Sequence, residues 1–197
     1  MARRKPHKKE IEIKGYKCNI KNRSDKPNRG GVGIYYRKGI ALEEIPLPTH
    51  QVPCKCEAIW NKITSRNGKR IILGIIYRSP QNLTFIEHLE QDINYMTQFN
   101  LPIFMIGDFN YDLLNRNAKV NELYDLLQCQ SMEQVIQEPT RITKDTKTLI
   151  DHIWVSDKEH IKNLQILPGM SDHQMLKFNI EIEYQQEERK SFKYRQI

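Results

Sequence analysis

Apolar and polar positions along the chain first mark out a sheet. Residues 55–63 alternate apolar and polar side chains, as a half-buried strand does. Residues 70–77 are apolar on both faces, which predicts a strand in the middle of a sheet. Between them stands Asn67-Gly68, a dipeptide that favours a tight hairpin turn. These patterns predict two neighbouring strands joined by a hairpin.

Helical spacing appears in two other segments. Thr84 and Glu87 form a capping-box pair, which predicts a helix from about Phe85 to Phe99. A second amphipathic helix is predicted over 120–127. The apolar stripe of the first helix is Leu83, Ile86, Leu89, Ile93 and Met96, and that of the second is Val120, Leu123, Leu126 and Leu127. Further strands are predicted at 32–36, 102–107, 150–156 and 175–182, with a weak one at 11–13. Strands that alternate with helices, with one hairpin among them, predict an α/β sandwich with a mixed sheet.

Length and charge fit one basic domain. The chain has 197 residues and a formal net charge of +7, and a positive balance favours polyanionic partners such as DNA. Basic residues crowd both ends, where such runs are usually solvated tails. We therefore expect a basic tail over 1–14, the domain over 15–183, and a charged linker or tail over 184–197.

The apolar segments of the chain bear on whether it enters a membrane or the secretory pathway. No apolar stretch is long enough to span a bilayer, and no apolar segment of a secretory signal follows the basic N-terminus. Four cysteines without zinc-ligand spacing are read as reduced packing residues. We expect an intracellular protein that does not contact membranes, and a nuclear one if it is functional.

Two groups of polar residues stand at strand ends. Asp108 and Asn110 follow a buried strand at a spacing that points both side chains to one side. An amide can donate to a phosphate oxygen, and a carboxylate can orient a water or take up a proton. Asp151 lies inside an apolar strand, where a carboxylate needs a partner, and Asp172-His173 offers an imidazole whose tautomer a carboxylate would fix. Taken one at a time, each group could equally be a polar turn or a cap.

The ordered set is more specific. Tyr77, then Gly-Asp-Phe-Asn at 107–110, Thr140, Asp151 and Ser-Asp-His at 171–173 follow one another along the chain. This order resembles the endonuclease/exonuclease/phosphatase superfamily, which includes deoxyribonuclease-I-like enzymes, and most of all the endonuclease domains of non-LTR (LINE-type) retrotransposons. Residues 29–37 resemble the glycine-rich strand of that group, and 190–195 the start of its linker to a reverse transcriptase.

The resemblance implies a fold and a reaction. The fold would be the deoxyribonuclease-I-like, four-layer α/β sandwich with two sheets. The activity would be hydrolysis of phosphodiesters in DNA with a divalent cation, usually Mg²⁺, with Mn²⁺ as an alternative. In the implied roles, Tyr77 and Asn110 contact the scissile phosphate, Asp108 assists proton transfer, Asp151 pairs with the catalytic His173, Asp172 belongs to the metal site, and Thr140 and Ser171 bind substrate.

The match departs from the family near the N-terminus. The family's metal-binding Glu lies upstream of a Gly-Tyr pair that we match to Gly15-Tyr16, and neither Glu10 nor Glu12 has its context. We therefore expect a fold that lacks the first strands and a weakened, even inactive, metal site. The alternatives are a phosphatase or lipid phosphodiesterase on the same fold, and a non-catalytic remnant that binds nucleic acid. Target-site preference and oligomeric state stay open.

Overall fold

A six-stranded mixed sheet forms the middle layer of the computed structural model, which describes residues 12–22, 31–47 and 56–181. The strands lie in the order β3 (Ala41–Glu44), β4 (Cys56–Thr64), β5 (Arg70–Arg78), β6 (Ile103–Asp108), β10 (Asp151–Val155) and β7 (Glu133–Gln134). β5 and β6 are parallel, and the other neighbours are antiparallel. The mixed sheet and the central place of β5 are therefore confirmed.

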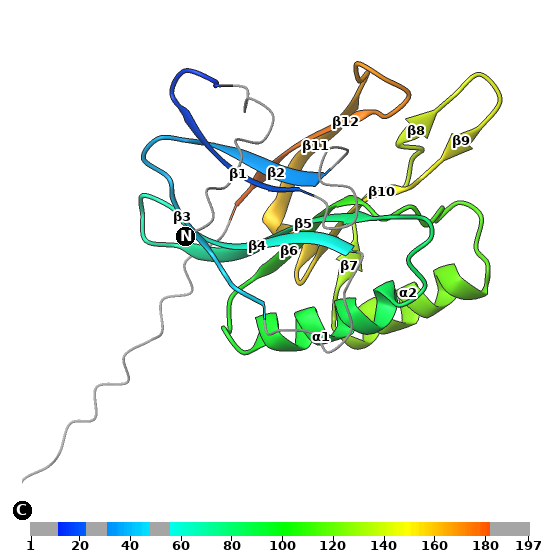
Figure 1. Cartoon of the computed structure of the whole chain (residues 1–197), viewed down its shortest axis with the longest axis horizontal. Coiled ribbons are helices and arrows are strands. Elements are labelled where there is room, and N and C mark those ends of the chain that lie inside the picture. The colour runs from blue at the N-terminus through cyan, green and yellow to red at the C-terminus, as the bar shows by residue number, and fades with distance from the viewer. Residues whose placement is uncertain (1–11, 23–30, 48–55, 182–197) are drawn as a thin grey trace, which may run out of the picture.

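Two α-helices cover one face of this sheet (Figure 1). They are α1 (Phe85–Thr97), which crosses from β5 to β6, and α2 (Ala118–Cys129). Trp60 of β4 points to the helices, because its Nε1 donates to Asp92 of α1 at 3.2 Å. Gly74 of β5 makes room for that indole, since a Cβ there would lie 2.7 Å from the Trp60 ring. This packing identifies the helix-facing side of the central strands.

Two two-stranded ribbons lie over the opposite face (Figure 1). One pairs β1 (Tyr16–Asn22) with β2 (Gly31–Arg37), and the other pairs β11 (Ile161–Leu167) with β12 (Met175–Ile180). A small hairpin, β8 (Arg141–Ile142) and β9 (Lys147–Thr148), and a 3₁₀ helix, η1 (Lys158–His160), complete the set. The predicted α/β sandwich is thus confirmed, and in the described ranges α-helices cover only one of its outer faces.

The β1–β2 ribbon corrects the expectation for β4. Lys21 Nζ donates to the carbonyl oxygen of Ala58 at 3.1 Å, and Asn19 reaches the side chain of Asn61. Because the ribbon covers this side, Glu57 is 5% exposed and Asn61 is fully buried. β4 is therefore buried on both faces and is not the half-buried strand that its alternation predicted.

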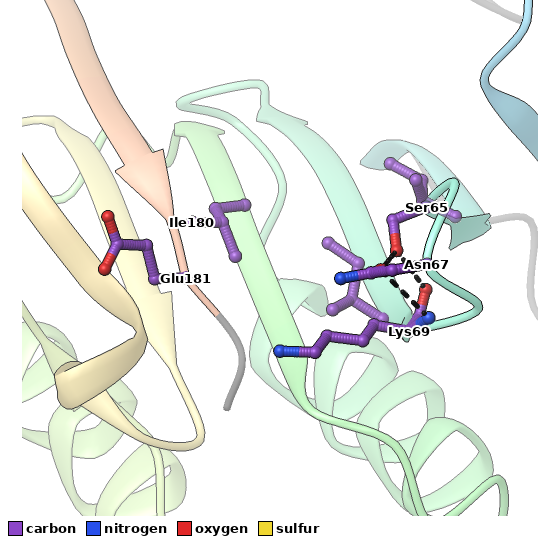
Figure 2. Close-up of a pocket in the computed structure, with 7 residues that line it drawn as sticks. Ser65, Asn67, Lys69, Ile180 and Glu181 are labelled. Carbon is purple, nitrogen blue, oxygen red and sulfur yellow. Dashed lines mark hydrogen bonds between the residues drawn. The ribbon is translucent and has the colours of Figure 1, made fainter. Parts of the chain in front are cut away.

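The predicted hairpin is present, with a longer loop than its dipeptide suggested. Residues 65–69 connect β4 to β5, and Gly68 takes the positive φ of 80°. A cavity of about 580 Å³ opens between this loop and the end of β12. In Figure 2, Ile180 and Glu181 stand on one side of it, and Ser65, Asn67 and Lys69 on the other.

The start of α1 differs from the expected capping box. Thr84 makes no side-chain cap, and its Oγ1 donates to Asn82 instead. Leu83, expected in the apolar stripe, is 81% exposed and precedes the helix. At the expected strand 11–13, Glu12 and Ile13 are not in a strand, and residue 11 lies outside the described ranges. So do residues 29–30 and the linker-like segment 190–195. None of the described helices is long and apolar enough to cross a membrane.

Candidate active site

Strand register lines up acidic and aromatic side chains across the sheet. Tyr77 pairs with Asp108 between β5 and β6, and Asp108 pairs with Asp151 between β6 and β10. Directly paired residues point to the same face of a sheet. Tyr77 stands three residues from Gly74, which faces the helices, so this row points to the ribbon side.

The row continues into β4 with a residue that the sequence did not single out. Glu57 pairs with Tyr77 and is buried beneath the β1–β2 ribbon. Glu57 alternates with Ala58 and Trp60, which places it on the opposite face of β4. This alternation could have indicated that Glu57 shares a face with Tyr77, but only if the pairing of β4 with β5 had been known. Hence the described sheet carries carboxylates at three of the four positions in this row.

His173 joins the row from a loop between β11 and β12. Its Nδ1 lies 2.9 Å from Oδ2 and 3.2 Å from Oδ1 of Asp151, which brings together the two residues that the resemblance pairs. The β8 end of the neighbouring hairpin holds this loop, because Gln174 N–H donates to the Thr140 carbonyl at 2.6 Å. Gly169 is required for the loop, since a Cβ there would lie 1.8 Å from the His173 carbonyl oxygen.

Asp108 has an unusual protonation equilibrium. Partial burial and then the charge of Asp151 raise its pKa to about 6, against the lowering effect of the Asn110 backbone N–H and the nearby cations. That N–H donates to Asp108 Oδ1 at 2.9 Å. One ligand atom from each of Asp108, Asp151 and His173 lies within 4.8 Å of the others. The three side chains therefore form one cluster in which a proton can be held or released near neutral pH.

Asn110 lies beside this cluster in a strained turn. Its φ is 51°, in the left-handed region that non-glycine residues seldom adopt. Its Nδ2 donates to the carbonyl oxygen of Arg78 at 2.8 Å. The side chain is therefore fixed next to Asp108.

Thr140 has a different contact from the one expected. Its side chain is fully buried, and its Oγ1 accepts the backbone N–H groups of Ile150 at 3.2 Å and Asp151 at 2.9 Å. In the structure this hydroxyl therefore holds the start of β10, and its contact with a nucleic-acid backbone stays a prediction.

Asp172 and Ser171 lie outside the cluster. Arg141 Nε donates to Asp172 Oδ2 at 2.7 Å, and this hydrogen bond lowers the pKa of Asp172. Ser171 Oγ accepts the backbone N–H of His173 at 3.2 Å. In the structure Asp172 therefore meets a guanidinium, and Ser171 shapes the loop that presents His173.

The cluster has the donors that a hard divalent cation takes. Asp108 and Asp151 offer carboxylate oxygens, the ligands that Mg²⁺ prefers, while Nδ1 of His173 contacts Asp151. Burial and then the charge of Asp151 raise the pKa of Asp108, and a cation held by these carboxylates would favour the ionised form of Asp108. Over the described ranges this is the one group of three or more His, Cys, Asp or Glu side chains close enough to hold a metal.

Comparisons with known proteins agree with this geometry. A family model described as endonuclease-reverse transcriptase matches residues 71–177, which is more than half of the chain. The matched range contains Tyr77, Asp108, Asp151 and His173. A search of the curated proteins found no match.

Solved structures share the fold at low sequence identity. The endonuclease domain of TRAS1, a telomere-specific non-LTR retrotransposon, superposes with a TM-score of 0.70 at 15% identity, covering 87% of this chain and 83% of that one. The catalytic domain of Xenopus laevis APE2 gives 0.58 at 14% identity, with 86% and 78% covered. ANGEL2, a 2′,3′-cyclic phosphatase, gives 0.55 at 13% identity, with 84% and 66% covered.

Proposed function

The chain belongs to the endonuclease-reverse transcriptase family, and on this premise we propose that it hydrolyses phosphodiester bonds in DNA as the nicking endonuclease of a non-LTR retrotransposon. The observation that carries the proposal is the convergence of Asp108, Asp151 and His173 from separate segments into one cluster. These residues are acid–base groups, and they stand beside the amide of Asn110.

His173 is the group that meets the phosphate in this proposal. Asp151 can only accept a hydrogen bond while it is ionised, so Nδ1 of His173 carries the proton between them. Nε2 is then the ring nitrogen that serves the reacting phosphoryl group. Asp151 acts through His173 by fixing its orientation and its tautomer.

Asp108 handles the proton of the reaction. Water attacks phosphorus, the bond to the leaving oxygen breaks, and the proton of the water must reach a base while the leaving oxygen gains one. A carboxyl whose pKa lies at about 6 can do either near neutral pH. Asn110 and Tyr77 complete the proposed site as phosphate contacts.

A divalent cation, which we propose is Mg²⁺, fits the oxygen donors of Asp108 and Asp151. When bound, it supplies positive charge against the negative charge that grows on the phosphate and the leaving oxygen. Asp172 is bound to Arg141 through Oδ2 at 2.7 Å, so Oδ1 is the oxygen with which it could join the cation.

A phosphatase on the same fold is the second candidate. The likeness to a 2′,3′-cyclic phosphatase favours it, since the same acid–base groups can serve a small phosphate ester. The net charge of +7 supports a polyanionic substrate and so favours DNA.

Nicking of supercoiled plasmid tests the proposal. We expect relaxed circles with Mg²⁺ and none with EDTA, and we expect His173→Ala to abolish the product. His160→Ala is the control, because that half-buried histidine contacts Phe104 instead of the site. Salt-sensitive binding without nicking would indicate a nucleic-acid-binding remnant, and turnover of a small phosphate ester without nicking would indicate the phosphatase.

A further inference from the structure

Arg78 is a buried cation at the end of β5. It is 7% exposed, and its guanidinium contacts main-chain carbonyls on two segments. Nη1 donates to the carbonyl oxygens of Asn110 at 3.0 Å and Phe109 at 3.3 Å, while Nη2 donates to that of Pro80 at 3.1 Å. The ring of Tyr111 lies 3.8 Å from its Cζ. Carbonyl dipoles and an aromatic face therefore replace the water that this cation loses on burial.

The main chain of Arg78 also contacts the turn at Phe109–Asn110, whose carbonyls its side chain binds. Its carbonyl oxygen accepts the Nδ2–H of Asn110 at 2.8 Å. A carbonyl can only accept, so this contact fixes which end of the Asn110 amide faces Arg78. Oδ1 of Asn110 consequently points away from Arg78, and the second N–H of Nδ2 is the donor left for a phosphate oxygen.

These contacts hold a left-handed backbone conformation that few residues other than glycine and asparagine adopt. Asn110 has a φ of 51°, and such conformations persist where the surroundings over-determine them. Arg78 contacts the carbonyl of Asn110, the carbonyl of Phe109 and the side-chain amide of Asn110. The Asp108–Asn110 contact of 2.9 Å lies within the same turn.

We propose that Arg78 is a positioning residue of the phosphodiesterase site, which fixes the turn at Phe109–Asn110 and aims the Asn110 amide at the scissile phosphate. The proposal rests on the proposed function for its substrate. A planar guanidinium reaches two segments at once and lies over the Tyr111 ring, whereas a lysine ammonium is a single point charge on a flexible stem. A positive charge alone at this position is therefore not enough to hold the turn, because the contacts need the several N–H donors of a guanidinium.

A double-mutant cycle of Arg78→Lys and Asn110→Ala tests the proposal through plasmid-nicking kinetics. We expect Arg78→Lys to lower kcat about 10- to 100-fold, because small misplacements of a positioned group cost that much, with KM changed less than threefold. In the Asn110→Ala background the same substitution should have little further effect. An equal loss in both backgrounds, or full activity of Arg78→Lys, would overturn the proposal.

Arg116→Lys is the matched control. Arg116 Cζ lies over the ring of Tyr124 at 3.9 Å, the same kind of contact, but Arg116 is exposed and its aromatic partner belongs to α2. We expect its kinetics to equal those of the parent. If Arg78→Lys fails to fold, Tyr111→Leu removes the ring beneath the guanidinium and should show the same non-additivity with Asn110→Ala.

An NMR measurement decides the positioning even if the parent chain does not nick. In ¹⁵N spectra we expect the side-chain amide of Asn110 to exchange slowly in the parent and to shift and exchange faster in Arg78→Lys. The indole signal of the distant Trp60 should stay in place. An unchanged Asn110 signal would refute the positioning role, while a parent that shows the expected signals without nicking would refute only the proposed function.

Discussion

Asp108 is the residue whose protonation should govern activity. Its pKa of about 6 comes first from burial and then from the charge of Asp151. If Asp108 takes up the proton of the attacking water, it must be ionised, so at low cation concentration the rate should rise with pH and level off above about 6, and a saturating cation should move this inflection to lower pH. We expect this inflection in the pH profile of kcat/KM and its loss in Asp108→Asn. A flat profile from pH 5 to 8 in the parent would contradict the assignment.

His152, the neighbour of Asp151, should make the fold acid-sensitive. It is fully buried, its Nε2 contacts the Tyr111 carbonyl at 2.9 Å, and burial lowers its pKa to about 4. Because the pKa of this histidine is lower in the folded state than in the unfolded state, its contribution to the free energy of unfolding is complete above about pH 6.5. That contribution is lost as the pH falls toward 4. The loss reaches about 3 kcal/mol. Urea unfolding at pH 7 and 5 should show a smaller pH difference for His152→Gln than for the parent, and equal differences would rule this out.

The candidate residues differ in how far the sequence could place them. Asp108, Asp151 and His173 were singled out because their order along the chain resembles that of the endonuclease/exonuclease/phosphatase superfamily. Glu57 was not singled out and the burial of Thr140 was not foreseen, because burial of a polar side chain depends on what covers it. Here the covering groups are the β1–β2 ribbon and the start of β10.

Helix capping at the element scale can be tested by a pair of substitutions. Asn117 caps α2, with Oδ1 accepting from Lys119 and Val120 N–H, whereas Thr84 makes no such bond at α1. Asn117→Ala should therefore lower the free energy of unfolding by about 1 kcal/mol. Thr84→Ala should change it by less than about 0.5 kcal/mol. If both variants lose the same free energy of unfolding in chemical denaturation, Thr84 does cap α1 and the expected capping box is present.

Gly107, the residue before Asp108, allows the backbone of β6 to lie close to the backbone of β5. Its φ is 150°, and a Cβ there would lie 1.8 Å from the Ile76 carbonyl oxygen. Gly107→Ala should therefore displace backbone and cost several kcal/mol. Gly68→Ala in the β4–β5 loop also has a positive φ but open space around it, so its cost should stay near 1 kcal/mol. Comparable denaturation midpoints for the two variants would disprove the close approach.

Apolar runs predicted the central elements better than the peripheral ones. β5 and β6 were found because strands buried on both faces have continuous apolar sequences. β7, β8 and β9 are two residues long each, and β11 carries an irregularity between Lys162 and Gln165. Short or interrupted strands leave too little alternation to recognise.

At the scale of the whole molecule, the candidate site depends on how the layers meet. The row from Tyr77 to Asp151 comes from the central sheet, while His173 comes from the loop between the strands of a ribbon. The sequence predicted an α/β sandwich and the pairing of Asp151 with His173. It did not predict that Arg141 would take the carboxylate of Asp172, because that contact requires the β8–β9 hairpin to lie beside the His173 loop.

Plasmid nicking by Asp108→Asn, Asp151→Asn, His173→Ala and the triple variant tests the central claim most directly. Groups that act as one unit are strongly non-additive. We predict that each single variant loses at least about 100-fold in rate, and that the triple variant is no slower than the slowest single one. Single variants that nick like the parent, or losses that multiply in the triple variant, would contradict a shared active site.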